Sequence, residues 1–259
     1  IILSGVGGQG ILSIATVIGK AALKDGLYMK QAEVHGMSQR GGDVQSNLRI
    51  SDQPIASDLI PSGKCDLIIS LEPMEGLRYL PFLSPEGWLV TNETPFINIP
   101  NYPAEADVRA ELDKLPHKII LNVDKVAKEI GSIRVANIVL LGATTPFLGI
   151  DYEKIQTSIC EIFERKGEAI VEMNLKALAA GKEIAEKLMV DIDDVKAALD
   201  VEESSRIELQ DGYTLILVDI PAIEIRHDQR TYTTIPLGII LTQDIIAVSY
   251  THLTLPTIL

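Results

Sequence analysis

Residues 1–10 read IILSGVGGQG, and this stretch decides the fold of the chain. An apolar strand runs directly into a glycine turn, in which Gly5, Gly7 and Gly10 have the spacing G-x-G-x-x-G and a further glycine stands at Gly8. Such a turn lets backbone N–H groups at the start of a helix approach an anion, because no Cβ blocks the approach. We therefore take the turn, with Gln9 inside it, as a candidate binding site.

Helix and strand patterns alternate along the chain after this turn. Apolar residues recur at helical spacing from residue 10 to 25. Short apolar runs at 28–34, 44–50, 66–70, 88–91 and 118–122 predict strands, and helices are expected at 73–79, from 124, and at 137–146, 151–164 and 168–188. The alternation predicts an α/β fold, with a doubly wound, mostly parallel sheet and helices on both faces.

The loop after the second predicted strand is the second candidate site. It reads EVHGMSQRGG and supplies Glu33, His35, Gly36, Met37, Ser38, Gln39, Arg40, Gly41 and Gly42. Arg40 can present a bidentate fork to a carboxylate or phosphate, and His35 can donate or accept a proton near neutral pH. Ligands of open α/β sheets bind beyond the carboxyl ends of strands, so we expect the two loops to meet at one sheet edge. A solvated polar loop is the alternative.

Composition excludes several classes of function. The net charge of −13 argues against nucleic-acid binding, which needs clustered Lys and Arg. Two cysteines and four scattered histidines have no metal-ligand spacing, so we predict no metal site and assign no catalytic residue. We find no signal peptide and no apolar run long enough to span a membrane, and we expect a cytoplasmic protein. The chain begins without Met and inside a strand, so we expect natural sequence to precede it.

Residues 1–188 resemble a known family. GVGGQGI, a helix, EVHGMSQRGG and a strand V-x-x-x-L-R-I are similar to the gamma-type domain of 2-oxoacid:ferredoxin oxidoreductases. EVHGMSQRGG looks like the loop of indolepyruvate ferredoxin oxidoreductase beta subunits, whereas the pyruvate and 2-oxoglutarate relatives carry other residues there. The later segments AEADVR, NIVLLGA and VEMNLKALAAG fit the same subunit.

This resemblance implies an enzyme subunit that works only with an alpha-type partner. The reaction would convert an arylpyruvate and coenzyme A into an arylacetyl-CoA and CO2, with two electrons passed to ferredoxin. Thiamine diphosphate, Mg and [4Fe-4S] clusters would belong to the partner, and this chain alone would bind no cofactor. The two loops would close the active site by facing the partner or by contacting substrate, cofactor or coenzyme A phosphates.

Two other functions stay open from the residues alone. A Rossmann-type, NAD-binding oxidoreductase expects an acidic residue about 20 positions after the glycines, and Glu33 comes close to that place. A binding module without catalysis is the other alternative.

The last seventy residues depart from this pattern. Residues 190–259 contain 4 of the 23 basic side chains of the chain and 12 of its 36 acidic side chains, so they are more acidic than the rest. A short acidic helix at 191–200 and short strands at 205–210, 213–220, 222–226, 231–235 and 239–241 predict a small β-rich appendage. Residues 190–247 resemble part of the cytoplasmic domain of CorA-family magnesium transporters, and 248–259 resemble an adapter-derived, non-native tail. We therefore expect a chimeric sequence with domains 1–188, 190–247 and 248–259, and a small β domain that belongs to the same subunit is the alternative.

Overall fold

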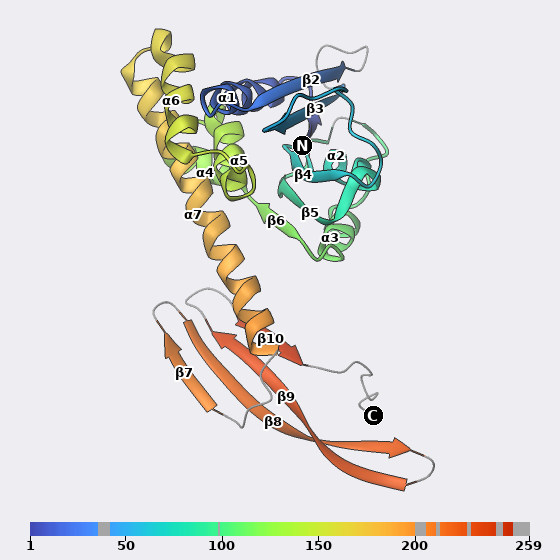
Figure 1. Cartoon of the computed structure of the whole chain (residues 1–259). Coiled ribbons are helices and arrows are strands. Elements are labelled where there is room, and N and C mark those ends of the chain that lie inside the picture. The colour runs from blue at the N-terminus through green and yellow to red at the C-terminus, as the bar shows by residue number, and fades with distance from the viewer. Residues whose placement is uncertain are drawn as a thin grey trace. The chain divides into compact units, whose positions relative to one another are not determined.

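The computed structural model describes residues 1–35, 42–97, 99–199, 206–210, 213–226, 229–241 and 246–250 (Figure 1). The chain divides into two compact units, Ile1–Glu186 and Lys187–Leu259. Each unit is described by itself below.

The first unit is built on a six-stranded sheet with the order β2-β3-β1-β4-β5-β6. The strands are β1 (Ile2–Val6), β2 (Tyr28–His35), β3 (Asp43–Ser51), β4 (Cys65–Ser70), β5 (Leu83–Asn92) and β6 (Lys118–Leu121). The four strands β1, β4, β5 and β6 are parallel, whereas β3 runs antiparallel to both of its neighbours. The alternation of helices and strands therefore predicted the mostly parallel sheet correctly, apart from β3.

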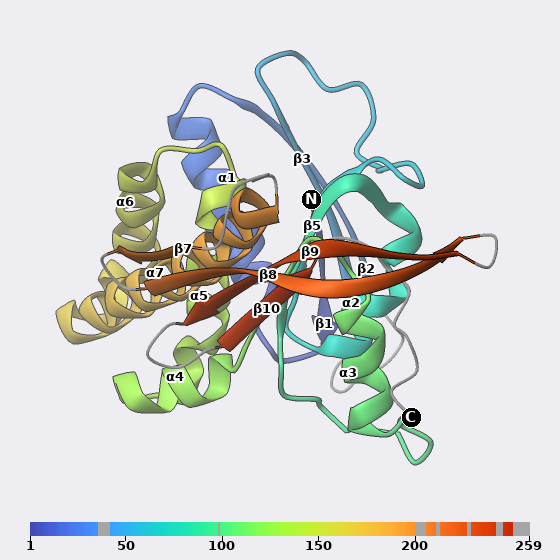
Figure 2. The same ribbon diagram turned by 90° about the horizontal axis from the view of Figure 1, so that it is seen from below.

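Helices cover both faces of this sheet. They are α1 (Ile11–Lys24), α2 (Pro73–Arg78), α3 (Glu105–Asp113), α4 (Val123–Ile130), α5 (Ala136–Thr144), α6 (Tyr152–Phe163) and α7 (Glu168–Leu199). In Figure 2, α1, α5 and α6 lie on one side of the strands, and α2 and α3 lie on the other. On the α2 and α3 side, Ile2, Ile68 and Leu89 of the sheet are fully buried and pack with Val108 and Leu112 of α3. The expected two-faced α/β fold is confirmed.

Two helix predictions need correction. Helix α7 runs without a break from Glu168 to Leu199, so the predicted end at residue 188 and the separate acidic helix at 191–200 are wrong. No Gly or Pro interrupts the chain there, and apolar residues continue at helical spacing through Ile192 and Val195. Helix α3 was not predicted, although Val108 and Leu112 are spaced four residues apart and Glu105 and Asp107 stand in its first turn.

The second unit contains a four-stranded antiparallel sheet of order β10-β9-β8-β7. The strands are β7 (Arg206–Gln210), β8 (Tyr213–Arg226), β9 (Gln229–Leu241) and β10 (Ile246–Tyr250). The predicted breaks at Pro221 and Pro236 are wrong, because both prolines lie within continuous strands. Pro221 of β8 lies outside the segment that pairs with β7, and Pro236 of β9 lies outside the segment that pairs with β10. Each proline therefore has one neighbouring strand instead of two, and its missing N–H interrupts no second ladder.

The proposed origin of the appendage stays a prediction. The β-rich character of residues 206–250 agrees with the expected fold class. Strand β10 includes the first three residues of the predicted tail, and residues 251–259 lie outside the described residues. The division at 188 and the resemblance to a transporter stay predictions as well.

Candidate functional site

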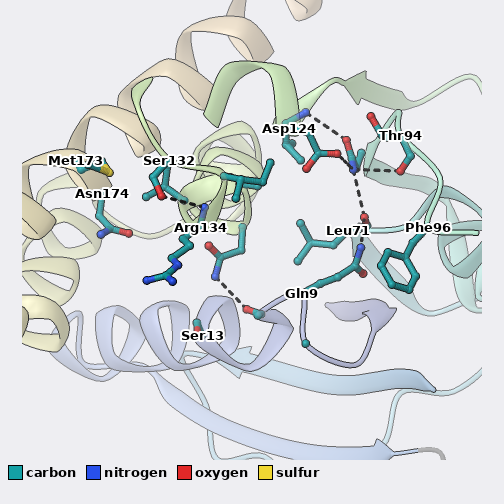
Figure 3. Close-up of a pocket in the computed structure, with 18 of the residues that line it drawn as sticks. Gln9, Ser13, Leu71, Thr94, Phe96, Asp124, Ser132, Arg134, Met173 and Asn174 are labelled. Carbon is teal, nitrogen blue, oxygen red and sulfur yellow. Dashed lines mark hydrogen bonds between the residues drawn. The ribbon is translucent and has the colours of Figure 1, made fainter. Parts of the chain in front are cut away.

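A cavity of about 700 Å³ opens at the carboxyl ends of the parallel strands of the first unit (Figure 3). The glycine turn after β1 lines it, as do Leu71 after β4, Asn92 at the end of β5, and Asp124 in the first turn of α4 after β6. Segments from η2 (Ile133–Val135), α5, the end of α6, η4 (Glu164–Lys166) and α7 complete its wall. This is the place where open α/β sheets bind their ligands, and the volume is suited to a cofactor-sized molecule.

The glycine turn contributes Gly8, Gln9 and Gly10 to this cavity. Gly8 has φ +100° and Gly10 has φ +89°, in the left-handed region that favours glycine. A Cβ on Gly10 would also come within 2.6 Å of the amide nitrogen of Asn137. Gly10 is the N-cap of α1, and no side chain caps the helix there. The N–H of Ser13 donates to the carbonyl oxygen of Gly10 at 3.1 Å, so the N–H groups of Ile11 and Leu12 are those left for a ligand or water.

Gln9 holds the turn in place. Its Oε1 accepts the N–H of Val6 at 2.7 Å, and its Nε2 donates to the carbonyl oxygen of Leu71 at 3.2 Å. The side chain also packs against Gly5, where an added Cβ would lie 2.8 Å from Oε1. Gln9 thus joins the end of β1 to the end of β4, and both ends of its amide are used within the chain.

Asn92 joins the next three segments of the cavity wall. Its side chain is buried, with 3% exposed. The Nδ2 group donates to the carbonyl oxygens of Leu71 and Thr94 and to Asp124 Oδ2, at 3.4, 3.2 and 3.2 Å. Its Oδ1 accepts the N–H of Val123 at 3.2 Å, at the start of α4. The ends of β4, β5 and β6 are therefore held in one arrangement.

Several groups in the cavity wall favour an anion. Helix α1 begins there without a side-chain cap and without an acidic residue in its first turn, whereas α5 continues directly from η2, whose N-cap Ser132 accepts the N–H of Arg134. Arg134 and Lys166 add two cations, and Figure 3 shows Arg134 extending between Ser13 of α1 and Asn174 of α7. Asp124 is the carboxylate among the described lining residues, and it accepts from Asn92. This arrangement favours an anionic group.

Apolar side chains stand at the edge of the cavity. Phe96 is 45% exposed, Ile133 is 48% exposed and Ile170 is 37% exposed, and all three line it. They come from three separate segments, the one between β5 and α3, η2 and α7. Exposed apolar residues that cluster around a cavity indicate a surface that another chain or a ligand covers.

The predicted loop begins within β2, and its last residue, Gly42, stands directly before β3. Glu33 and His35 belong to β2, so the strand is longer than predicted and the loop starts after His35. Glu33 is exposed and accepts from Gln31 Nε2 at 2.6 Å. Gly42 accepts the N–H of Gly7 at 2.8 Å, which brings the far end of the loop against the glycine turn. Gly36, Met37, Ser38, Gln39, Arg40 and Gly41 lie outside the described residues, so their role at the site stays a prediction.

The strand order disfavours the dinucleotide alternative. In a Rossmann fold the acidic residue ends the strand that pairs with the first strand. Here β3 lies between β1 and β2, which places β2 about 10 Å from β1, two strand spacings away. Glu33 is also absent from the described lining of the cavity. Glu33 therefore has the sequence spacing of a Rossmann acidic residue but not its position in the fold.

Several cavity residues were missed at the level of sequence. Asn92, Asp124, Arg134 and Asn137 were not singled out. The rule that function follows strand ends was applied only to the first two predicted strands, and it also points to Asn92 and Asp124. Arg134 and Asn137 had no such indication, because they reach the cavity through the packing of η2 and α5.

Comparisons with known proteins decide the family. The family model described as "Pyruvate ferredoxin/flavodoxin oxidoreductase" matches residues 1–184. The chain belongs to this family. It is 36% identical over 190 residues to the indolepyruvate oxidoreductase subunit IorB of Archaeoglobus fulgidus, covering 70% of this chain and 92% of that subunit. It is 35% identical over 199 residues to the Pyrococcus horikoshii subunit of the same name, covering 73% and 96%.

A solved structure of a family member shares the fold of the first unit. The gamma subunit of a keto/oxoacid ferredoxin oxidoreductase from Geobacter sulfurreducens is 28% identical, with a TM-score of 0.55, and the match covers 72% of this chain and 97% of that subunit. These findings confirm the predicted relationship to the family for the first part of the chain. Among the described residues, none of the helices is both long and apolar enough to cross a membrane.

Proposed function

We propose that this chain is the non-thiamine subunit of an indolepyruvate, or more broadly arylpyruvate, ferredoxin oxidoreductase. The complex would convert an arylpyruvate, coenzyme A and two oxidised ferredoxins into an arylacetyl-CoA, CO2, a proton and two reduced ferredoxins. The similarity to two IorB subunits over nearly their whole length carries this proposal.

The residues of the chain fit a division of labour with a catalytic partner. A [4Fe-4S] cluster takes four cysteine ligands, and this chain has two cysteines. Cys65 is buried in β4 and Cys160 is partly exposed on α6, on separate elements of the fold. A cluster therefore does not fit this chain, and the clusters, thiamine diphosphate and Mg would reside on an alpha-type partner.

The cavity is our candidate for contact with coenzyme A. The uncapped start of α1, with Arg134 and Lys166, suits the phosphate groups of that molecule. The apolar side chains of Leu71, Phe96 and other lining residues suit its less polar arm. In the complex, this subunit would hold the acyl acceptor and exclude water, while the partner's thiamine would supply decarboxylation chemistry.

The test is reconstitution of the complex. We would co-express the chain with the large cluster-bearing subunit, purify the complex without oxygen, and measure indolepyruvate-dependent reduction of ferredoxin with coenzyme A varied. Arg134→Gln should raise the KM for coenzyme A about five- to tenfold, which corresponds to about 1 to 1.4 kcal/mol. Arg109→Gln is the matched control, because Arg109 is exposed, pairs with Glu93 and Asp113, and is not among the residues that line this cavity.

Three results would count against the proposal. Turnover of indolepyruvate by this chain alone would refute its dependence on a partner. Binding of NAD(H) by the isolated chain would favour the dinucleotide alternative. Association with the large subunit that leaves turnover unchanged would favour a binding module without a part in catalysis.

A further inference from the structure

Glu72 is a buried carboxylate two residues after the end of β4, next to the cavity residue Leu71. Its side chain is only 1% exposed. As the N-cap of α2, it accepts the N–H of Glu75 through Oε2 at 2.8 Å. Glu is not among the residues that favour this position, since Ser, Thr, Asp and Asn cap a helix with a shorter side chain. Capping alone therefore does not account for a glutamate here.

The second oxygen of Glu72 holds the segment that forms one wall of the cavity. Oε1 accepts the N–H of Phe96 at 3.3 Å and the hydroxyl of Tyr102. Burial and the bond to Glu72 raise the pKa of the Tyr102 hydroxyl, so it remains a donor at neutral pH. Thr94, Pro95 and Phe96 line the cavity, and they belong to the same connection between β5 and α3.

Asn92 also holds this connection at Thr94 and Tyr102 packs against the core, but the apolar side chains from Phe96 onward are exposed. Phe96 is 45% exposed, and Ile97 and Ile99 are 64% and 38% exposed, so burial of these three side chains contributes little to ordering the part of the segment that lines the cavity. The anchors from Glu72 join it to the end of β4. Leu71, the neighbour of Glu72, in turn accepts from Gln9 and from Asn92.

We propose that Glu72 and Tyr102 are positioning residues that hold Phe96 against the ligand in the cavity. This inference rests on the proposed function, in which the cavity binds coenzyme A. Neither residue is among those that line the cavity, so both act through the connection between β5 and α3.

The test uses the reconstituted complex and three variants. Tyr102→Phe removes one hydrogen bond to Glu72 and keeps the ring. We expect the KM for coenzyme A to rise about three- to tenfold with kcat within about twofold of wild type. Tyr79→Phe is the matched control and should change neither constant, because Tyr79 is 8% exposed and its hydroxyl has no hydrogen bond among the described residues.

A double-mutant cycle with Phe96→Ala tests the route of the effect. If Tyr102 acts through Phe96, the double variant should be no worse than the more damaging single variant. Hydrogen exchange of the complex provides a readout independent of turnover. Amides from Glu93 to Ala104 should exchange faster in Tyr102→Phe than in wild type, with α3 unchanged.

The inference is overturned if an active wild-type complex and Tyr102→Phe have the same KM for coenzyme A, or if only kcat falls. The inference would also be overturned if the increase in KM of the double variant equalled the product of the increases in the two single variants. A wild-type complex whose turnover does not depend on coenzyme A would instead refute the proposed function on which the inference rests.

Discussion

Gly142 of α5 and Gly181 of α7 face each other where the two helices cross, with no space for a side chain. A Cβ on Gly142 would lie 2.1 Å from the carbonyl oxygen of Leu178, and one on Gly181 would lie 1.9 Å from that of Val139. Both clashes are with backbone atoms, which cannot rotate away. This close crossing brings α7 to the cavity, where it supplies Met173 and Asn174.

Gly181→Ala is therefore expected to destabilise the first unit, by about 2 kcal/mol or more. The gain in helix propensity of about 1 kcal/mol is smaller than the cost of moving two helices apart. Urea denaturation followed by circular dichroism measures the change. Ala179→Leu is the control, because Ala179 is exposed on the same helix and should stay within about 0.5 kcal/mol of wild type. Equal stability of Gly181→Ala and wild type would contradict the crossing.

Glu161 on α6 pairs with Lys20 at 2.6 Å and with Lys24, both on α1, and these contacts lower the pKa of its carboxyl. A lowered pKa in the folded state gives stability that is present above the unfolded pKa and is lost as pH falls through the folded value. Glu161→Gln should therefore be less stable than wild type at pH 7, and the difference should shrink below about pH 4.

Thermal unfolding at pH 7, 5, 4 and 3 checks this expectation. Glu86→Gln is the control, since Glu86 is exposed on β5 and has no ion pair among the described side chains. A difference between Glu161→Gln and wild type that is the same at every pH would show that the ion pairs do not cause it.

Arg40→Ala should weaken activity of the complex more than alanine at Arg78 or Arg109. A desolvated charged hydrogen bond contributes roughly 1.5–3 kcal/mol and an exposed ion pair about 0–1 kcal/mol, so we expect a loss of about ten- to a hundredfold for Arg40. Arg78 bonds Glu75 through two nitrogens, and Arg109 pairs with Glu93 and Asp113, so both controls have partners within the chain. Equal, small losses in kcat/KM at all three positions would mean that Arg40 is only solvated.

Residues 190–259 should be dispensable for assembly and activity. The first unit ends at Glu186 and contains every described residue that lines the cavity. A chain that ends at Met189 is expected to keep its melting temperature and its binding to the alpha-type partner. Calorimetry and co-purification measure these two properties. A truncated chain that unfolds or no longer binds the partner would show that the appendage belongs to the working protein.

The sequence by itself determined the class of the fold and identified the glycine turn that forms one wall of the cavity. Apolar periodicity is local, so it identified most of the strands and helices of the first unit within a few residues. The glycine turn was also recognisable from sequence, because its backbone conformation at Gly8 and Gly10 requires glycine. Helix α7 shows the limit of this approach, since a change of composition at Asp191 did not end it.

Only the tertiary structure decided the strand order and the partners of the turn. The insertion of β3 between β1 and β2 depends on pairing between distant segments, which no local pattern records. The same holds for Asn137, which donates to the carbonyl oxygen of Gly10 at 3.2 Å across 127 residues of sequence, and for Glu72, which reaches Tyr102. A cavity wall forms where separate elements pack together, and the free energy that selects this packing comes from burial across the whole unit rather than from any single stretch of the chain.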